Sequence, residues 1–332
     1  MLHIMEYTIL NTFINEKKKS CRESTWKSYK KDIIQFLDNA LKISKVDDEY
    51  DLFNNFDADG GYKNISFVQN TFNNMTNDYA YKKNSINTKR ASISTFFEYL
   101  VGMGLIKTTP INKQSIAKYK ELTDSEKKHV LLKEEVDELL LACDKHSKGE
   151  KMIAFSSSRD KLLISLMYCT GLRISEAIRI KLSDMDKVEN GYMINITEHK
   201  TSDTVGTKRV PLSNKCLGYY DEYMIERSKL KNIIDENYLF LSSSGRKDCK
   251  DSRMGKNIFN KRVLKSNIKV KDGYKLSTHC LRYGFRNKLM ENNINKDLID
   301  MIGGWVREGM GMVYAQDGVE KDSMKIEACN IL

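Results

Sequence analysis

Residues 276–316 read LSTHCLRYGFRNKLMENNINKDLIDMIGGWVREGMGMVYAQ, and the interpretation of the whole chain starts from them. Ser277 and Thr278 form a helix-capping pair, and apolar residues follow at helical spacing. These apolar residues are Leu281, Phe285 and Leu289. The pattern predicts a helix with His279 and Arg282 in its first turn. Because they are three residues apart, we expect their side chains to point the same way.

A Gly303-Gly304-Trp305 turn comes after this predicted helix. Nine residues after the tryptophan stands Tyr314, in a Met- and Gly-rich run with no other hydroxyl side chain nearby. A cation, an imidazole, an indole N–H and a phenol within one short region indicate chemistry on a phosphate.

A second cationic cluster lies upstream, in the sequence TGLRISE at residues 170–176. Arg173 stands at the start of a predicted short helix, three residues before Glu176. TGLRISE, then HCLR, then GGW followed nine residues later by Tyr, resemble the tyrosine recombinases (phage integrase family) in order, spacing and residue type. The resemblance covers nearly the whole chain, because the first half is also similar to the family's core-binding domain.

The resemblance and the periodicity together predict a mainly α fold with a small β-sheet. We expect a helical core-binding (SAM-like), DNA-binding domain at 1–110, a polar linker at 111–128 and an α+β catalytic domain at 129–332. In the first domain helices are expected over 4–16, from Ser24 or Thr25 as cap, over 66–79 and over 87–103, with a loop at 47–64. In the second, helices are expected over 133–145, 158–169, 213–230 and 252–266, and strands over 192–197, 208–212 and 238–241. One more helix is expected after Tyr314.

The resemblance implies a role for each motif residue. Tyr314 would be the nucleophile that holds the phosphate covalently, so that rejoining needs no ATP. Arg173 and Arg282 would bind the non-bridging phosphate oxygens bidentately. Lys200, in the turn between two predicted strands, would give the leaving 5′ hydroxyl its proton, and Lys208 is the alternative.

The remaining motif residues would assist. His279 would accept the phenol proton or hydrogen-bond the phosphate. Trp305 stands where most family members have histidine and some have tryptophan, and an indole is a donor only. Glu176 would orient Arg173 or His279. The resemblance implies neither a metal nor a cofactor.

Basic residues beside the apolar stripes of the first domain are the predicted phosphate contacts. They are Lys27, Lys30, Lys31, Lys89 and Arg90. The whole chain has 332 residues, with 55 Lys+Arg against 45 Asp+Glu and a net charge of +10, as expected of a protein that binds a polyanion. The same excess of charge is also typical of a merely solvated, Lys-rich surface.

The seven cysteines include no C-x-x-C pair, so neither a disulfide framework nor a structural zinc site is expected. No run approaches membrane-spanning length and no signal pattern opens the chain. These features predict a cytoplasmic protein without a membrane partner.

The favoured hypothesis is a site-specific recombinase (integrase) that acts on inverted half-sites of double-stranded DNA. It would work as a homo-oligomer, a tetramer on DNA, through a 3′-phosphotyrosine and a Holliday junction, with or without accessory proteins. In this family the C-terminal helix often packs on a neighbouring protomer. Two alternatives stay open, a catalytically inactive recombinase-derived DNA-binding protein and a type IB topoisomerase-like enzyme that relaxes DNA anywhere.

Overall fold

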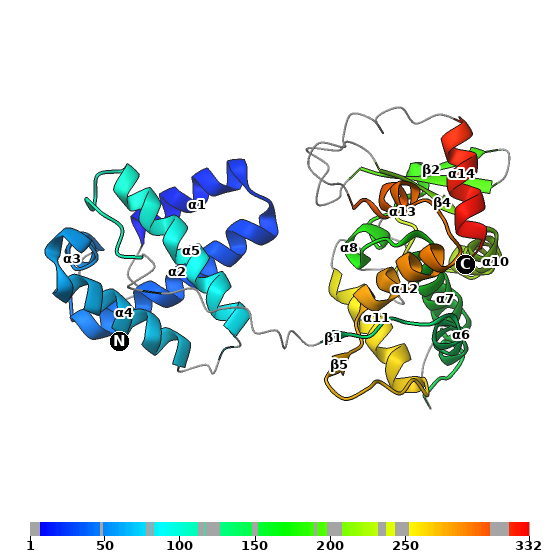
Figure 1. Cartoon of the computed structure of the whole chain (residues 1–332), viewed down its shortest axis with the longest axis horizontal. Helices are drawn as coiled ribbons and strands as arrows, with labels where there is room; N and C mark the ends of the chain where they lie inside the picture. The colour runs from blue at the N-terminus through cyan, green and yellow to red at the C-terminus, as the bar shows by residue number, and fades with distance from the viewer. Residues whose placement is uncertain are drawn as a thin grey trace. The chain divides into compact units, whose positions relative to one another are not determined.

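The computed structural model describes residues 7–46, 49–77, 81, 83–111, 116, 127–147, 152–188, 191–197, 208–231, 237–242, 252–305 and 319–331. The chain forms two compact units, Met1–Ser125 and Glu126–Leu332, and each has its own hydrophobic core. Helices dominate both units and the second also holds a small sheet (Figure 1), so the predicted fold class is confirmed. Across the described ranges, no helix combines the length and the apolar character needed to cross a membrane.

Among the described residues, the first unit has five α-helices around an aromatic core. They are α1 (Thr8–Ser20), α2 (Glu23–Ser44), α3 (Glu49–Asn54), α4 (Tyr62–Asn77) and α5 (Lys83–Gly102). Helix α2 packs against both α4 and α5. Phe36 and Phe97 are fully buried and meet edge to face, with ring centroids 5.8 Å apart, a favoured aromatic geometry.

Several details of this unit differ from the sequence-based expectation; α1 and α4, for example, run over Thr8–Ser20 and Tyr62–Asn77 instead of 4–16 and 66–79. Helix α2 begins at Glu23 with Arg22 at the N-cap, so the predicted Ser24 or Thr25 cap is wrong. Helix α3 lies inside the segment predicted to be a loop. Its Leu52 and Phe53 are buried in the core, so tertiary packing outweighs the turn-forming composition around them.

The second unit is organised around α7 (Ile153–Thr170), whose residues are nearly all buried. Helices α6 (Lys133–Ala142), α10 (Asn214–Ser228) and α12 (Thr278–Glu291) pack against it, as Figure 1 shows. The other α-helices are α8 (Ile174–Ala177), α11 (Ser252–Lys265), α13 (Lys296–Gly303) and α14 (Val319–Asn330). The second half of α7, from Leu162 to Thr170, is mainly apolar and entirely buried, as expected of a helical segment at the centre of a core. The run of Leu, Ile and Met before TGLR therefore places that motif next to the hydrophobic core of the second unit.

Three antiparallel strands form the sheet in the order β2-β3-β4. They are β2 (Met185–Val188), β3 (Gly191–Ile196) and β4 (Lys208–Leu212), with Ile196 opposite Lys208. The last two confirm the predicted strand pair, whereas β2 was not anticipated. The third predicted strand is wrong, because Tyr238 makes only a single bridge with Lys181. A short parallel pair, β1 (Lys127–Lys128) and β5 (Tyr274–Lys275), leads into α6 and α12.

The C-terminal helix α14 packs on β4 and α7 of the same chain. The Asn214 N–H donates to Asn330 Oδ1 at 2.9 Å, and Arg209 lies 3.3 Å from Asp322. This confirms a helix in the tail. Its packing on a neighbouring protomer stays a prediction.

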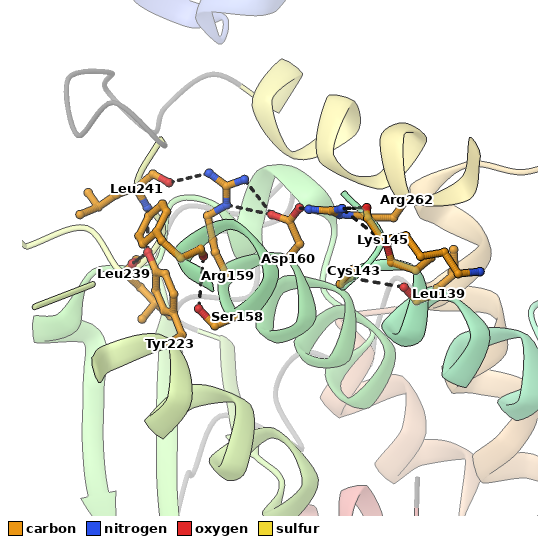
Figure 2. A network of polar contacts seen from close by, with 12 residues as sticks. Leu139, Cys143, Lys145, Ser158, Arg159, Asp160, Tyr223, Leu239, Leu241 and Arg262 are labelled. Atoms are coloured by element: carbon orange, nitrogen blue, oxygen red, sulfur yellow. Dashed lines mark hydrogen bonds and ion pairs between the residues drawn. The ribbon is translucent and has the colours of Figure 1, made fainter. Parts of the chain in front are cut away.

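A buried polar network ties α7 to α11 and to the segment after α10 (Figure 2). Asp160 accepts hydrogen bonds from Arg159 Nε at 2.9 Å and Arg262 Nε at 2.8 Å. Arg159 Nη1 also donates to the Leu241 carbonyl at 3.2 Å. All three charged side chains are almost fully buried, so each depends on the others for compensation.

Replacing Asp160 by asparagine should therefore destabilise the second unit strongly. The change leaves two buried guanidiniums without their carboxylate, and breaking a buried ion pair in this way costs about 3–5 kcal/mol. Urea unfolding measures the loss. Asp272→Asn, at an exposed position of the same unit, is the matched control and should change stability by less than ~0.5 kcal/mol. A loss below about 1 kcal/mol for Asp160→Asn would contradict this account.

Candidate functional site

Arg173 and Arg282 approach one another around the loop that joins α7 to α8. Arg282 lies on the first turns of α12, and its Nη1 donates to the Gly171 carbonyl, two residues before Arg173. Arg173 is the N-cap residue of α8 and its side chain is about a quarter exposed, at 26%, whereas Arg282 is buried. Burial and the neighbouring Arg173 charge lower the pKa of Arg282 to about 10. The guanidinium is still charged at neutral pH.

Glu176 fixes the orientation of Arg173. Its Oε2 accepts the Arg173 backbone N–H at 2.9 Å, and its Oε1 lies 2.6 Å from Arg173 Nη1. Burial opposes ionisation of this carboxyl, but the Lys208 cation and the Arg173 hydrogen bonds outweigh it, so the pKa of Glu176 lies below its ordinary value. The predicted spacing of three residues thus places a carboxylate directly on the arginine.

Trp305 holds the other arginine. The centroid of its indole ring lies 4.0 Å from the guanidinium carbon of Arg282. The same centroid lies 5.3 Å from the guanidinium carbon of Arg286, one helical turn further on. The ring also stacks on Phe285, at an interplanar angle of 23°. A guanidinium on an aromatic face is attracted by the ring quadrupole and cannot swing freely. One hydrogen bond and one aromatic face therefore restrain Arg282.

The two glycines before Trp305 make this placement feasible. Gly303 lies against the indole ring, so a Cβ there would overlap the ring atoms. Gly304 ends α13 with a φ of +67°, the left-handed conformation that glycine adopts without strain. The backbone can then turn back, and the backbone N–H of Trp305 donates to the Asp300 carbonyl at 2.9 Å.

Lys208, the first residue of β4, is buried in the same cluster. Its Nζ donates to the Gly303 carbonyl at 3.1 Å and lies 3.8 Å from Glu176 Oε2. Burial lowers the pKa of Lys208 to about 7; the Glu176 carboxylate opposes this effect, while Arg282 and Arg173 add to it. In the part of the chain that the structure describes, Arg173, Arg282 and Lys208 outnumber the one carboxylate, so the cluster suits an anion.

The other predicted catalytic residues are not all placed. His279 lies on the first turn of α12 and is exposed, three residues before Arg282. Lys200 and Tyr314 both lie outside the described residues, so their positions stay predictions. The structure therefore brings together Arg173, Glu176, Arg282 and Trp305, and adds Lys208.

The predicted phosphate contacts of the first unit fall into three groups. Lys27, Lys30 and Lys31 are exposed on α2, and Lys27 lies 2.6 Å from Glu23. Arg90 is half-buried, and its Nε donates to the Ile116 carbonyl. Lys89 requires a correction.

Lys89 is buried inside the first unit rather than presented on its surface. Its Nζ lies 2.9 Å from Asp32 Oδ1 and donates to Gln35 Oε1 at 2.7 Å. This buried ammonium connects α5 to α2 through its carboxylate partner and is not presented on the surface to a phosphate.

Sequence reasoning gave too little weight to two residues of the site. Lys208 stands two residues before the buried Val210 on β4. Side chains two apart on a strand lie on the same face, so this spacing could have indicated that Lys208 points inward. Arg286 follows Arg282 by four residues, the spacing that places both on one helix face. Neither signal identifies the partner, because Gly303, Glu176 and Trp305 are distant in sequence.

A family model and individual relatives all match this chain to the same family. The Phage integrase family model matches residues 129–321, more than half of the chain. Tyrosine recombinase XerD of Oceanobacillus iheyensis is 25% identical over 307 residues, 90% of each chain. Tyrosine recombinase XerC of Staphylococcus aureus is 24% identical over 310 residues, 92% of this chain and 89% of its own.

Solved structures share the fold. A lambda integrase tetramer bound to a Holliday junction has a TM-score of 0.61 at 16% identity, covering 94% of this chain and 79% of that one. XerH recombinase bound to its difH substrate in a pre-cleavage complex has a TM-score of 0.58 at 17% identity, covering 95% and 82%. At such identities the likeness extends to the fold alone.

Proposed function

Because this chain belongs to the phage integrase family of tyrosine recombinases and is a site-specific recombinase enzyme, we propose that it cuts and rejoins DNA through a 3′-phosphotyrosine and a Holliday junction. The observation that carries the proposal is an unsatisfied hydrogen-bond donor on the Arg282 guanidinium. Its Nη2 is buried and has no hydrogen-bond partner among the residues that the structure describes. A buried donor of this kind is costly unless a ligand satisfies it. A phosphate oxygen is a suitable acceptor.

The two arginines would bind the scissile phosphate in its transition state. As the pentavalent phosphorus forms, negative charge grows on the non-bridging oxygens, and two planar guanidiniums can bind them bidentately. The supporting contacts are Glu176 on Arg173 and Trp305 on Arg282. These contacts hold both guanidiniums in place before DNA arrives, so little reorganisation is needed during the reaction.

The proposed chemistry conserves the phosphodiester. The Tyr314 oxygen attacks phosphorus as its proton passes to His279 or to solvent, and the bond from phosphorus to the 5′ oxygen breaks. The 5′ oxygen takes a proton from Lys200 and leaves as a hydroxyl. In the reverse direction another 5′ hydroxyl attacks the phosphotyrosine. Trp305 can donate its indole N–H to the phosphate but cannot act as acid or base.

The proposed substrate is double-stranded DNA with inverted half-sites, bound by a homotetramer. We assign residues 1–110 to a core-binding domain, 111–128 to a linker and 129–332 to the catalytic domain. The proposed contacts of the first domain with the phosphates of the DNA backbone are Lys27, Lys30, Lys31 and Arg90. Raising the salt concentration should weaken binding, because each phosphate contact releases counterions.

The test uses a nicked duplex made from DNA that flanks the gene or its element. After cleavage beside the nick, the short fragment that carries the new 5′ hydroxyl diffuses away, so the covalent intermediate accumulates. We expect a protein–DNA adduct on a denaturing gel, and a protease digest in which the peptide containing Tyr314 carries the nucleotide.

Two outcomes would favour the other functions. Binding of the duplex without any adduct would support the inactive DNA-binding protein. Relaxation of supercoiled plasmids that lack the site would support a topoisomerase-like enzyme.

A further inference from the structure

Lys208 is a buried cation at the junction of the two halves of the site. One half consists of α8, where Glu176 fixes Arg173. The other half consists of the Gly303–Trp305 turn, whose indole restrains Arg282. The Lys208 ammonium contacts both halves, through Glu176 Oε2 at 3.8 Å and the Gly303 carbonyl at 3.1 Å.

The aliphatic part of Lys208 also supports the turn. A Cβ added at Gly304 would lie 3.2 Å from Lys208 Cδ, so the lysine chain runs directly beneath the backbone of the turn. Only 4% of the side chain is exposed. An apolar residue could fill this space without the cost of desolvating an ammonium. A lysine therefore carries a free-energy cost at this position, and the two polar groups that its Nζ contacts, the Gly303 carbonyl and the Glu176 carboxylate, both belong to the site.

In the sequence, the Gly303–Trp305 turn ends nine residues before Tyr314. Lys208 thus connects the carboxylate that orients one arginine to the turn that precedes the tyrosine.

We propose that Lys208 is a positioning residue that locks the Gly303–Trp305 turn to Glu176, and so sets the two arginines in register around the phosphate. The inference rests on the proposed function, and it assigns Lys208 a role other than that of the proton donor. Lys200 is then the donor to the 5′ oxygen.

The two roles can be separated with a substrate that carries sulfur in place of the bridging 5′ oxygen. An alkyl thiol has a pKa of about 8.5, far below that of water or an alcohol, so a thiolate leaves without being protonated. A variant that lacks the proton donor should regain its rate on the sulfur substrate. A variant with a misplaced phosphate site should stay slow on both.

We expect Lys208→Met to lower the single-turnover cleavage rate on the order of 10²-fold on the oxygen and sulfur substrates alike, the scale of a misplaced reacting group. Lys200→Ala should be slow on the oxygen substrate and close to wild type on the sulfur substrate. Lys187→Met, at an exposed lysine of β2, is the matched control and should cleave like wild type.

Recovery of Lys208→Met on the sulfur substrate would overturn the proposal and make Lys208 the proton donor. A rate equal to wild type on the oxygen substrate would overturn it as well. Failure of wild type to form an adduct on either substrate would instead reject the proposed function. If Lys208→Met does not fold, Lys208→Gln takes its place, since its shorter amide side chain is uncharged yet retains donors.

A second measurement tests whether Lys208 acts through Glu176. If it does, the rate loss of the Lys208→Met, Glu176→Gln double variant should be clearly smaller than the product of the two single losses. Multiplicative losses would mean that the two residues act independently, which contradicts the proposed lock.

Discussion

Replacing Tyr314 by phenylalanine is expected to abolish the covalent protein–DNA adduct while leaving DNA affinity within a few fold of wild type. The change removes one oxygen, and that oxygen is the atom proposed to bond to phosphorus. The run from 306 to 316 contains no other hydroxyl side chain, so no neighbour in the sequence offers a second phenol or alcohol. The adduct is measured on a denaturing gel and the affinity by a gel shift at fixed salt concentration.

Tyr274→Phe is the matched control for Tyr314→Phe. Tyr274 lies on β5 in the second unit and is half-buried, and its variant loses the same phenolic hydroxyl at a position with no proposed catalytic role. It should form the adduct at the wild-type rate. Persistence of the adduct in Tyr314→Phe would place the nucleophile at another of the 17 tyrosines and reject the assignment.

Helix α12 shows what local sequence can predict. Ser277 occupies the N-cap as expected, and Leu281, Phe285 and Leu289 are all fully buried. Period and cap chemistry are properties of a few neighbouring residues, so they are visible in one sequence. The Arg173 and Glu176 pair was predicted for the same reason, since it lies within one helical turn.

Lys89 and Lys208 show where local sequence reasoning stops. Each lysine has a carboxylate partner far away in the chain, Asp32 for the first and Glu176 for the second. Nothing in the neighbouring residues distinguishes such a lysine from a solvated one, because charge type alone predicts exposure. Only the tertiary fold shows that Lys89 connects two helices and that Lys208 lies within the site.

Helix α3 is a further instance of tertiary packing that local composition does not reveal. The segment EYDLFN is surrounded by Asp, Asn and Gly residues that favour turns. Its six residues are too few for a stable isolated helix, so it depends on burial of Leu52 and Phe53. By contrast, the catalytic roles of Lys200 and Tyr314 rest on the motif resemblance alone.

Replacing Arg282 by lysine is expected to lower the single-turnover cleavage rate by roughly 10²–10³-fold, the loss typical of one electrostatic donor in a transition state. Lysine keeps the charge but presents a point cation instead of a planar fork, so it cannot bind two phosphate oxygens bidentately. It also cannot stack flat on the Trp305 indole, 4.0 Å from the guanidinium carbon, while bonding to the Gly171 carbonyl. Rates are measured with saturating DNA, so that the chemical step is separated from binding.

The control for Arg282→Lys is the same change one helical turn away. Arg286 also faces Trp305, at 5.3 Å, but it is partly exposed and lies 3.6 Å from Asp300. An exposed cation–π contact is worth about 0.5–1 kcal/mol, so Arg286→Lys should slow cleavage only a few fold. Equal losses at the two positions would show that the aromatic contact, and not bidentate phosphate binding, accounts for the effect. A far larger loss at Arg282 is the result that the buried, unpartnered Nη2 requires, because that donor has no acceptor among the described side chains and backbone groups until a phosphate binds.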